Sequence, residues 1–87
     1  MKIVFQGDSI TDAGHSFDYE NLGEGYVRMI YNALHFENKK VNVYNRGTDG
    51  FTTKNVKRFW NLQHHKLTPD FITILVGIND IAVMKST

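Results

Sequence analysis

Three short polar segments in this 87-residue chain combine glycine with side chains suited to acyl-transfer chemistry. They read Gly7-Asp8-Ser9, Asn45-Arg46-Gly47 and Gly77-Ile78-Asn79-Asp80. A serine hydroxyl beside backbone N–H groups suits nucleophilic attack on a carbonyl, because the N–H groups stabilise the negative oxygen that forms. Each segment also has a simpler interpretation, since Gly, Asp, Asn and Ser are all common in turns.

The candidate roles differ from one segment to the next. Ser9 either presents its hydroxyl as a nucleophile or caps a turn of helix. Gly47 either exposes its N–H as an oxyanion donor or is an ordinary turn glycine. The Asn79 amide is either a further donor or a partner of its own loop. We expect Asp80 to support that loop or to cap a following helix, and Asp8 to support the site.

Apolar runs predict strands just before each of these segments. Residues 2–6 read as a short buried strand that ends at a glycine. Residues 41–44 alternate apolar and polar side chains, which favours a strand near a sheet edge. Residues 71–76 are almost continuously apolar, which is typical of a central strand covered on both faces.

Helices are expected between these strands. Helical spacing predicts one over residues 26–36. A second begins at Thr52 or Thr53, carries Val56, Phe59 and Trp60 on one face, and breaks before Pro69. Residues 7–25 are polar and glycine-rich and are expected to form a long loop. Residues 81–84 are expected to open another helix.

The order of these elements, β-α-β-α-β, favours a parallel sheet with right-handed crossovers. In such a sheet the loops after the strands lie at one edge, where ligands bind. We therefore expect one serine and three potential donors to meet on a common rim.

The composition excludes several classes of protein. Ten basic and nine acidic residues give a net charge of +1, and no basic run suggests nucleic acid or an anionic membrane as a partner. The absence of cysteine excludes disulfides and thiolate chemistry. The chain has no signal-like start and no apolar run near the roughly 20 residues that a membrane span requires. The expected location is the cytoplasm.

The three polar segments resemble the first three conserved blocks of the SGNH (GDSL-type) serine acylhydrolases. The first match extends through Gly7-Asp8-Ser9-Ile10-Thr11-Asp12, and the second through Asn45-Arg46-Gly47-Thr48-Asp49-Gly50. Residues 22–27 (Leu-Gly-Glu-Gly-Tyr-Val) and Pro69-Asp70 also resemble the branch that acts on carbohydrate esters. The match spans nearly the whole chain.

The resemblance implies a three-layer α/β/α, flavodoxin-like fold and ester hydrolysis, with carbohydrate esters or similar alcohols as substrates. It implies Ser9 as the nucleophile. It implies an oxyanion hole made of the Ser9 and Gly47 N–H groups and the Asn79 side chain, with no metal and no cofactor.

The family's last block, Asp-x-x-His, has no match here. We therefore expect residues 1–87 to be the amino-terminal part of a single SGNH domain that is catalytically incomplete alone, because serine needs a base. His15 is close enough in sequence to approach Ser9 as a substitute, but no orienting partner is apparent and a solvated surface residue is the preferred interpretation. The other histidines (His35, His64 and His65) are interpreted as solvated surface residues remote from Ser9, and Asp12, Asp18 and Glu20 as ordinary loop acids.

The sequence allows two alternatives to an enzyme fragment. A non-catalytic remnant could use its apolar sheet edge for assembly. We expect the chain to self-associate, to pair with a complementary fragment or to expose an apolar edge. A nucleotide-binding domain using residues 7–11 for phosphate is disfavoured, because the loop has neither a lysine nor a Gly-x-Gly-x-x-Gly pattern.

Overall fold

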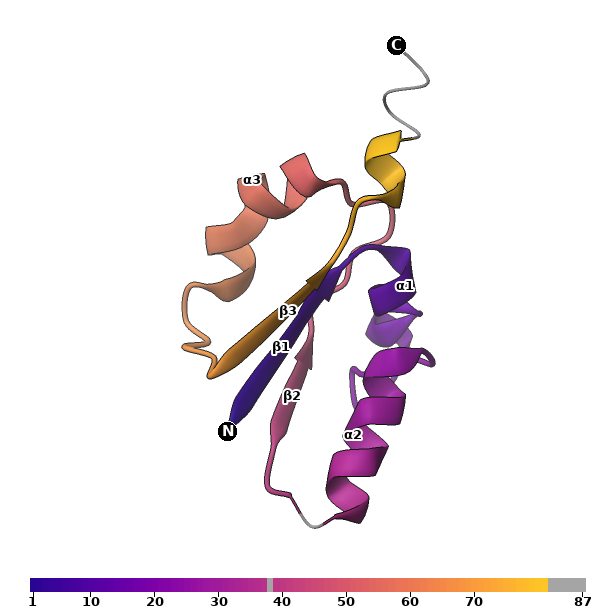
Figure 1. Ribbon diagram of the computed structural model, residues 1–87, viewed down its shortest axis with the longest axis vertical. Helices are drawn as coiled ribbons and strands as arrows, with labels where there is room; N and C mark the ends of the chain where they lie inside the picture. The colour runs from indigo at the N-terminus through magenta and orange to yellow at the C-terminus, as the bar shows by residue number, and fades with distance from the viewer. Residues whose placement is uncertain (38, 82–87) are drawn as a thin grey trace.

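The computed structural model describes residues 1–37 and 39–81, in which strands alternate with helices (Figure 1). The elements are β1 (Lys2–Gly7), α1 (Ser9–Asp12), the 3-10 turn η1 (His15–Phe17), α2 (Tyr26–Phe36), β2 (Asn42–Asn45), α3 (Thr53–His64) and β3 (Phe71–Leu75). The α/β class predicted from the sequence is confirmed.

Strand β1 lies between the other two strands in a parallel sheet of order β2-β1-β3. Phe5 is paired with Asn45 on one side and with Thr73 on the other. The expected edge position of β2 is therefore confirmed. Residues 71–76 were expected to suit a central strand, and within the described residues β3 pairs with β1 alone and has its other edge open. An apolar run indicates that a strand needs covering, but not how many neighbours it has.

Helices α2 and α3 lie on opposite faces of the sheet, which gives three layers (Figure 1). The connections from β1 to β2 and from β2 to β3 run in opposite directions, so right-handed crossovers place their helices on opposite faces. The strand order 2-1-3 is the start of the flavodoxin-like order. Ligands of such sheets bind beyond the carboxyl ends of the strands where the order reverses, here between β1 and β3.

The larger apolar core lies between the sheet and α2. Phe5, Leu22 and Val27 are each at most 3% exposed, and Tyr26 packs against them with its ring edge-to-face to Phe5. Complete burial of side chains of this size stabilises the fold by roughly 2 kcal/mol each. This packing fixes β1 and the loop between α1 and α2 against each other.

The opposite face of β1 contacts α3 through a buried polar pair. Gln6 is fully buried, and its Oε1 lies 2.6 Å from Nε2 of His64. His64 is 6% exposed, so its interpretation as a surface residue is wrong. It follows Val56 and Trp60 at intervals of four residues, which places all three on one stripe of the helix.

The helix boundaries follow from local sequence signals. Helix α2 spans the residues predicted for it. Thr52 caps α3, accepting the Asn55 N–H while the Asn55 side chain accepts the Thr52 N–H, which is a reciprocal capping box. The expected long loop over residues 7–25 instead contains α1 and η1. Residues 78–81 form a helical turn, and the rest of the helix expected over 81–84 lies outside the described residues.

The β3 side of the molecule is apolar and open. Phe71, Ile74 and Leu75 are 58%, 55% and 47% exposed, and Ile78 beyond the strand is also exposed. The predicted exposure of an apolar sheet edge is therefore confirmed. Across the described ranges, every helix is too short or too polar to cross a membrane.

Candidate active site

Ser9 is the first residue of α1, immediately beyond the carboxyl end of β1. Asp8 is the N-cap: its buried carboxylate accepts the Ile10 N–H at 3.1 Å. The Asp8 N–H donates to the Leu75 carbonyl at 3.3 Å, which ties the turn to the end of β3. Asp8 therefore supplies the helix cap, and Ser9, which is exposed, is left free to meet a substrate.

Gly47 is buried where the loop after β2 crosses α1. A Cβ on this residue would lie 2.3 Å from the Asp12 nitrogen, so the close approach requires glycine. The Thr48 N–H donates to the Gly7 carbonyl at 3.0 Å, which joins the loop to the end of β1. The Gly47 N–H itself donates to Asn45 Oδ1 at 2.8 Å. Its role as an oxyanion donor stays a prediction, and it requires that this bond be exchanged.

Asn45 organises the site, and the sequence reasoning gave it no role. It is fully buried. Its Nδ2 donates to the carbonyls of Thr11 at 2.7 Å and Leu22 at 2.8 Å, while Oδ1 accepts the Gly47 N–H. One side chain thus fixes α1, the segment before α2 and the loop after β2. Its place at the end of a strand, two residues before a glycine, was the available signal.

Gly50 lies further along the same loop and is exposed. Its φ is +80°, and a Cβ there would meet nothing within 4 Å. The Phe51 N–H donates to the Thr48 carbonyl at 3.2 Å, which closes a turn around Gly50. Among the described residues the Gly50 N–H has no hydrogen-bond partner. The turn therefore presents a backbone donor that the sequence reasoning missed.

The residues after β3 attach to the same turn and to α3. Asn79 Nδ2 donates to the Phe51 carbonyl at 2.9 Å, which uses one of its two N–H bonds and leaves the other for a ligand. Asp80 Oδ1 accepts the Thr53 N–H at 2.8 Å, and Oδ2 contacts the Thr53 hydroxyl. Asp80 therefore caps the start of α3, and not a helix that follows it.

His15 reaches the rim but bonds to groups other than Ser9. Its Nδ1 lies 2.6 Å from Asn21 Oδ1, and its Nε2 lies 3.0 Å from the Gly47 carbonyl and 3.6 Å from an Asp12 oxygen. This arrangement anchors η1 to the Gly47 loop. The other histidines also have partners elsewhere: His35 packs on Tyr31, His64 bonds Gln6, and His65 bonds the Asn61 carbonyl.

Three titratable groups, His64, Asp18 and Arg28, have shifted pKa values for identifiable reasons. Burial lowers the pKa of His64, and the positive charge of Arg46 lowers it further. Burial would raise the pKa of Asp18, but hydrogen bonds from backbone N–H groups and from Arg28 outweigh it and lower the value. The interpretation of Asp18 as an ordinary loop acid is therefore wrong. Over residues 1–37 and 39–81, no group of three or more His, Asp or Glu side chains is arranged to hold a metal ion.

The structure thus places Ser9, the Gly47–Gly50 loop and Asn79 beyond the carboxyl ends of three neighbouring parallel strands. Of the predicted donors, the Gly47 N–H is bonded internally, and Asn79 keeps one free N–H. A hydroxyl group and potential hydrogen-bond donors therefore lie on one rim of the sheet. Such a set of groups is suited to acyl transfer.

Comparison with known proteins identifies similar sequences. The family described as GDSL-like Lipase/Acylhydrolase matches residues 5–87. An acetylxylan esterase from Geobacillus stearothermophilus is 33% identical over an alignment 87 residues long. The alignment includes 92% of this chain and 40% of that protein. The chain therefore spans about 40% of the length of this relative.

Solved structures of hydrolases are also similar to this chain, which again covers only part of their length. Axe2, an acetylxylan esterase from Geobacillus stearothermophilus, superimposes with a TM-score of 0.85 at 33% identity, covering 93% of this chain and 40% of that chain. LAE5, an alpha/beta hydrolase enzyme from the metagenome of Lake Arreo, matches with a TM-score of 0.85 at 30% identity, covering 98% and 43%. Structures described as catalytic mutants of Axe2 carry alanine in place of a serine, an aspartate or a histidine.

Proposed function

We propose, since this chain belongs to the GDSL-like lipase/acylhydrolase family, that it supplies the nucleophile and the oxyanion donors of a serine ester hydrolase. The observation that carries the proposal is the position of Ser9. It is exposed at the first turn of α1, where the strand order of the sheet reverses. Asn79 and the loop over Gly47–Gly50, called the glycine loop from here on, attach to the same rim.

In the proposed reaction the Ser9 Oγ attacks the ester carbonyl carbon as a base removes the hydroxyl proton. The carbonyl oxygen becomes an oxyanion that accepts hydrogen bonds from the Ser9 N–H, the free N–H of Asn79 and a backbone N–H of the glycine loop. Collapse of this intermediate breaks the bond to the alcohol, which leaves with the proton. Water then attacks the acyl-serine, releases the acid and restores the Ser9 hydroxyl.

The glycine that donates in this scheme is either Gly47 or Gly50. Gly47 would first have to give up its bond to the buried Asn45 side chain, which is itself held by two further hydrogen bonds. The Gly50 N–H has no such competitor among the described residues, and its turn carries the Phe51 carbonyl that Asn79 bonds. These contacts favour Gly50.

The base is proposed to come from outside residues 1–87. His15, the histidine of the rim, has both ring nitrogens directed at other oxygen atoms. The aspartate and histidine whose replacement gives catalytic mutants of Axe2 indicate the kind of partner that Ser9 requires. We accordingly propose that residues 1–87 alone are inactive or nearly so.

The proposed substrate class is acetyl esters of xylose-based carbohydrates, by likeness to the acetylxylan esterases. A second candidate, a non-catalytic assembly module, is favoured by a different observation: the apolar β3 edge, where Phe71, Ile74 and Leu75 are about half exposed. The two candidates differ in whether Ser9 reacts.

Labelling with a fluorophosphonate tests the proposal. The chain is incubated with the probe alone and together with a polypeptide comprising the remainder of Axe2, and the adduct is mapped by mass spectrometry. We expect slow labelling of Ser9 that the added polypeptide accelerates, no adduct in Ser9→Ala, and unchanged labelling in Ser16→Ala, a control at an exposed serine of η1. Equal labelling of Ser9→Ala would refute the proposed nucleophile, and a Ser9 that stays unlabelled in the mixture would favour the assembly module.

A further inference from the structure

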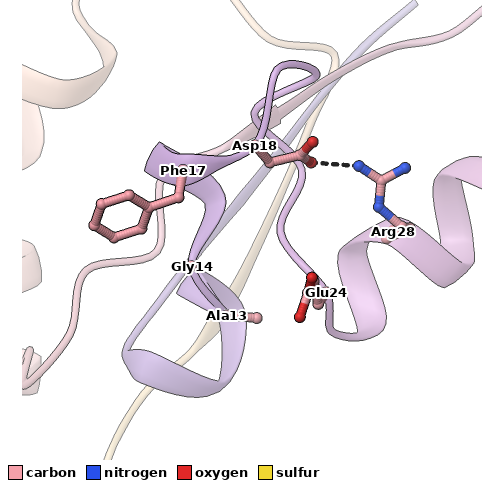
Figure 2. Close-up of a pocket in the computed structure, with 6 residues that line it drawn as sticks. All are labelled: Ala13, Gly14, Phe17, Asp18, Glu24 and Arg28. Carbon is pink, nitrogen blue, oxygen red and sulfur yellow. Dashed lines mark hydrogen bonds and ion pairs between the residues drawn. The ribbon is translucent and has the colours of Figure 1, made fainter.

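A depression of about 500 Å³ lies beside the end of α1 (Figure 2). Its lining combines a phenyl ring, two carboxylates and a guanidinium group with small residues at its base. The lining residues are Ala13, Gly14, Phe17, Asp18, Glu24 and Arg28. None of them takes part in the acyl transfer described above.

The loop that borders this depression is firmly anchored through Asp18. Its carboxylate accepts N–H groups of Glu20 at 3.3 Å, Leu22 at 3.1 Å and Gly23 at 3.2 Å, and it pairs with the Arg28 guanidinium. Figure 2 shows the Asp18 carboxylate directed toward Arg28, while the side chain of Phe17 points away from that pair. The backbone that carries the neighbours of Asp18 is therefore held in place.

Both neighbours of Asp18 are aromatic and fully exposed. Phe17 is 96% exposed and lines the depression, and Tyr19, also fully exposed, lies with Phe17 and Asp18 along a smaller hollow that adjoins it. An ordered loop that holds two aromatic rings in water loses the hydrophobic stabilisation that their burial would give. It also offers a binding partner large apolar surfaces on a backbone that is already ordered.

Hydrogen-bonding groups remain available elsewhere in the lining of the depression. The Arg28 guanidinium uses three of its five N–H bonds, on Gly23, Glu20 and Asp18, which leaves two. The Glu24 side chain makes no hydrogen bond or ion pair within the described part of the chain and can accept from hydroxyl groups. A pyranose ring has complementary chemistry: C–H faces that stack on aromatic rings, and hydroxyl groups that both donate and accept.

The depression is close to the proposed nucleophile. The Ala13 N–H donates to the Ser9 carbonyl at 2.9 Å, so Ser9 and the lining residue Ala13 stand at the two ends of a single helical turn. One turn advances about 5 Å, which is similar to the span of one sugar ring. A sugar ring bound against Ala13 would therefore lie about one ring length from the residue that carries the proposed nucleophile.

We propose that Phe17, Tyr19, Glu24 and Arg28 form a carbohydrate subsite that binds a sugar ring of the ester substrate. This inference rests on the proposed function and deepens it, because it assigns the selection of a sugar-linked alcohol to residues of this chain. The rings supply stacking, and the two charged side chains fix the orientation of the hydroxyl groups.

Titration of the 87-residue chain with xylotetraose, followed by NMR, tests the subsite without turnover. We expect saturable shifts at residues 17–28, and affinity reduced at least tenfold in the double variant Phe17→Ala/Tyr19→Ala. The matched control is Phe36→Ala, which removes an aromatic ring that is 89% exposed at the end of α2, and it should bind as the parent does. Glu24→Gln, a change on an exposed side chain, keeps the fold and should weaken binding severalfold.

Unchanged affinity in both the double variant and Glu24→Gln would overturn the subsite, as would the absence of any shift with xylotetraose. Loss of self-association in the double variant with no change in sugar binding would identify the rings as a contact between copies and would also overturn it. Fluorophosphonate labelling of Ser9 tests the proposed function independently of sugar binding. Labelling without sugar binding refutes the subsite alone, whereas sugar binding without labelling refutes the nucleophile.

Discussion

Strands β2 and β3 flank the same central strand, yet they contribute to the rim in different ways. At the end of β2, Asn45 is fully buried and hydrogen-bonded to three segments. At the end of β3, Leu75 is 47% exposed, and Asn79 beyond it is attached by a bond to Phe51. The β2 flank therefore holds its part of the rim by buried packing, whereas the β3 flank relies on a few hydrogen bonds at the surface.

The two flanks should therefore differ in whether a substitution changes the free energy of unfolding or the reactivity of Ser9. Asn45 and Gly47 are buried on the packed side, so changes to them should alter the free energy of unfolding. Asn79 lies on the open side, where changes should alter the reactivity of Ser9 more than they alter folding. Paired substitutions on the two flanks measure how far this separation extends.

The largest expected effect comes from removing a core ring of β1. Phe5→Ala should lower the free energy of unfolding by about 3–5 kcal/mol, because it opens a cavity beside Leu22 and Val27. Phe71→Ala is the matched control on β3 and should change stability by about 0.5 kcal/mol or less, since that ring is 58% exposed. Urea denaturation of both variants measures the contrast, and equal losses would show that the two flanks are equally packed.

The next effect comes from the buried amide at the end of β2. Asn45→Ala should cost about 2–3 kcal/mol, because two carbonyls and the Gly47 N–H lose their partner away from water. Asn42→Ala, at an exposed position of the same strand, should cost about 0.5 kcal/mol or less. Thermal unfolding would contradict the assigned role of Asn45 if the two variants melted together.

A smaller effect is expected on the open flank. Asp80→Ala removes the carboxylate that caps α3 through the Thr53 N–H, and should cost about 1 kcal/mol. Because Asp80 is adjacent to Asn79, fluorophosphonate labelling of Ser9 should slow by more than the change in stability explains. Asp49→Ala, at an exposed position of the glycine loop, serves as the control. If Asp80→Ala labelled Ser9 at the same rate as the parent chain, the position of Asn79 would not matter for the reaction.

The smallest effect is a dependence of stability on pH. The pKa of His64 is lower in the folded chain than in the unfolded chain, so the folded state favours the neutral imidazole. The stability it contributes is present above the unfolded pKa of about 6.5 and is lost as the pH falls below it. Between pH 7 and pH 6 the loss should be less than about 1 kcal/mol. His64→Gln should flatten this slope and His65→Gln, at an exposed position, should not; identical slopes would contradict the assignment.

The sequence predicted those features that depend on local patterns. The periodicity of α2, the Thr52 cap and the glycine stops after the strands gave the element order, and that order gave the parallel sheet and its rim. The long first loop was not resolved into α1 and η1, because four-residue and three-residue turns are too short to show periodicity.

Partner identity across the fold was not accessible from the sequence. The stripe formed by Val56, Trp60 and His64 was present, but only the structure shows that Gln6 faces it. Likewise, the segment around Gly47 suggested an N–H donor, while the bond from that N–H to Asn45 became visible only when both backbone and side chain were placed. Reasoning from residue types identifies candidate donors, and the contacts decide which donors are free.

Amide NMR of the isotopically labelled chain, compared before and after fluorophosphonate reaction with Ser9, tests the central claim most directly. The account predicts that the phosphonyl oxygen shifts the side-chain amide signals of Asn79 and one glycine amide of the loop, with Gly50 favoured and Gly47 still bonded to Asn45. Perturbations confined to residues 8–12 would contradict it, because the three strand ends would then not meet at one point.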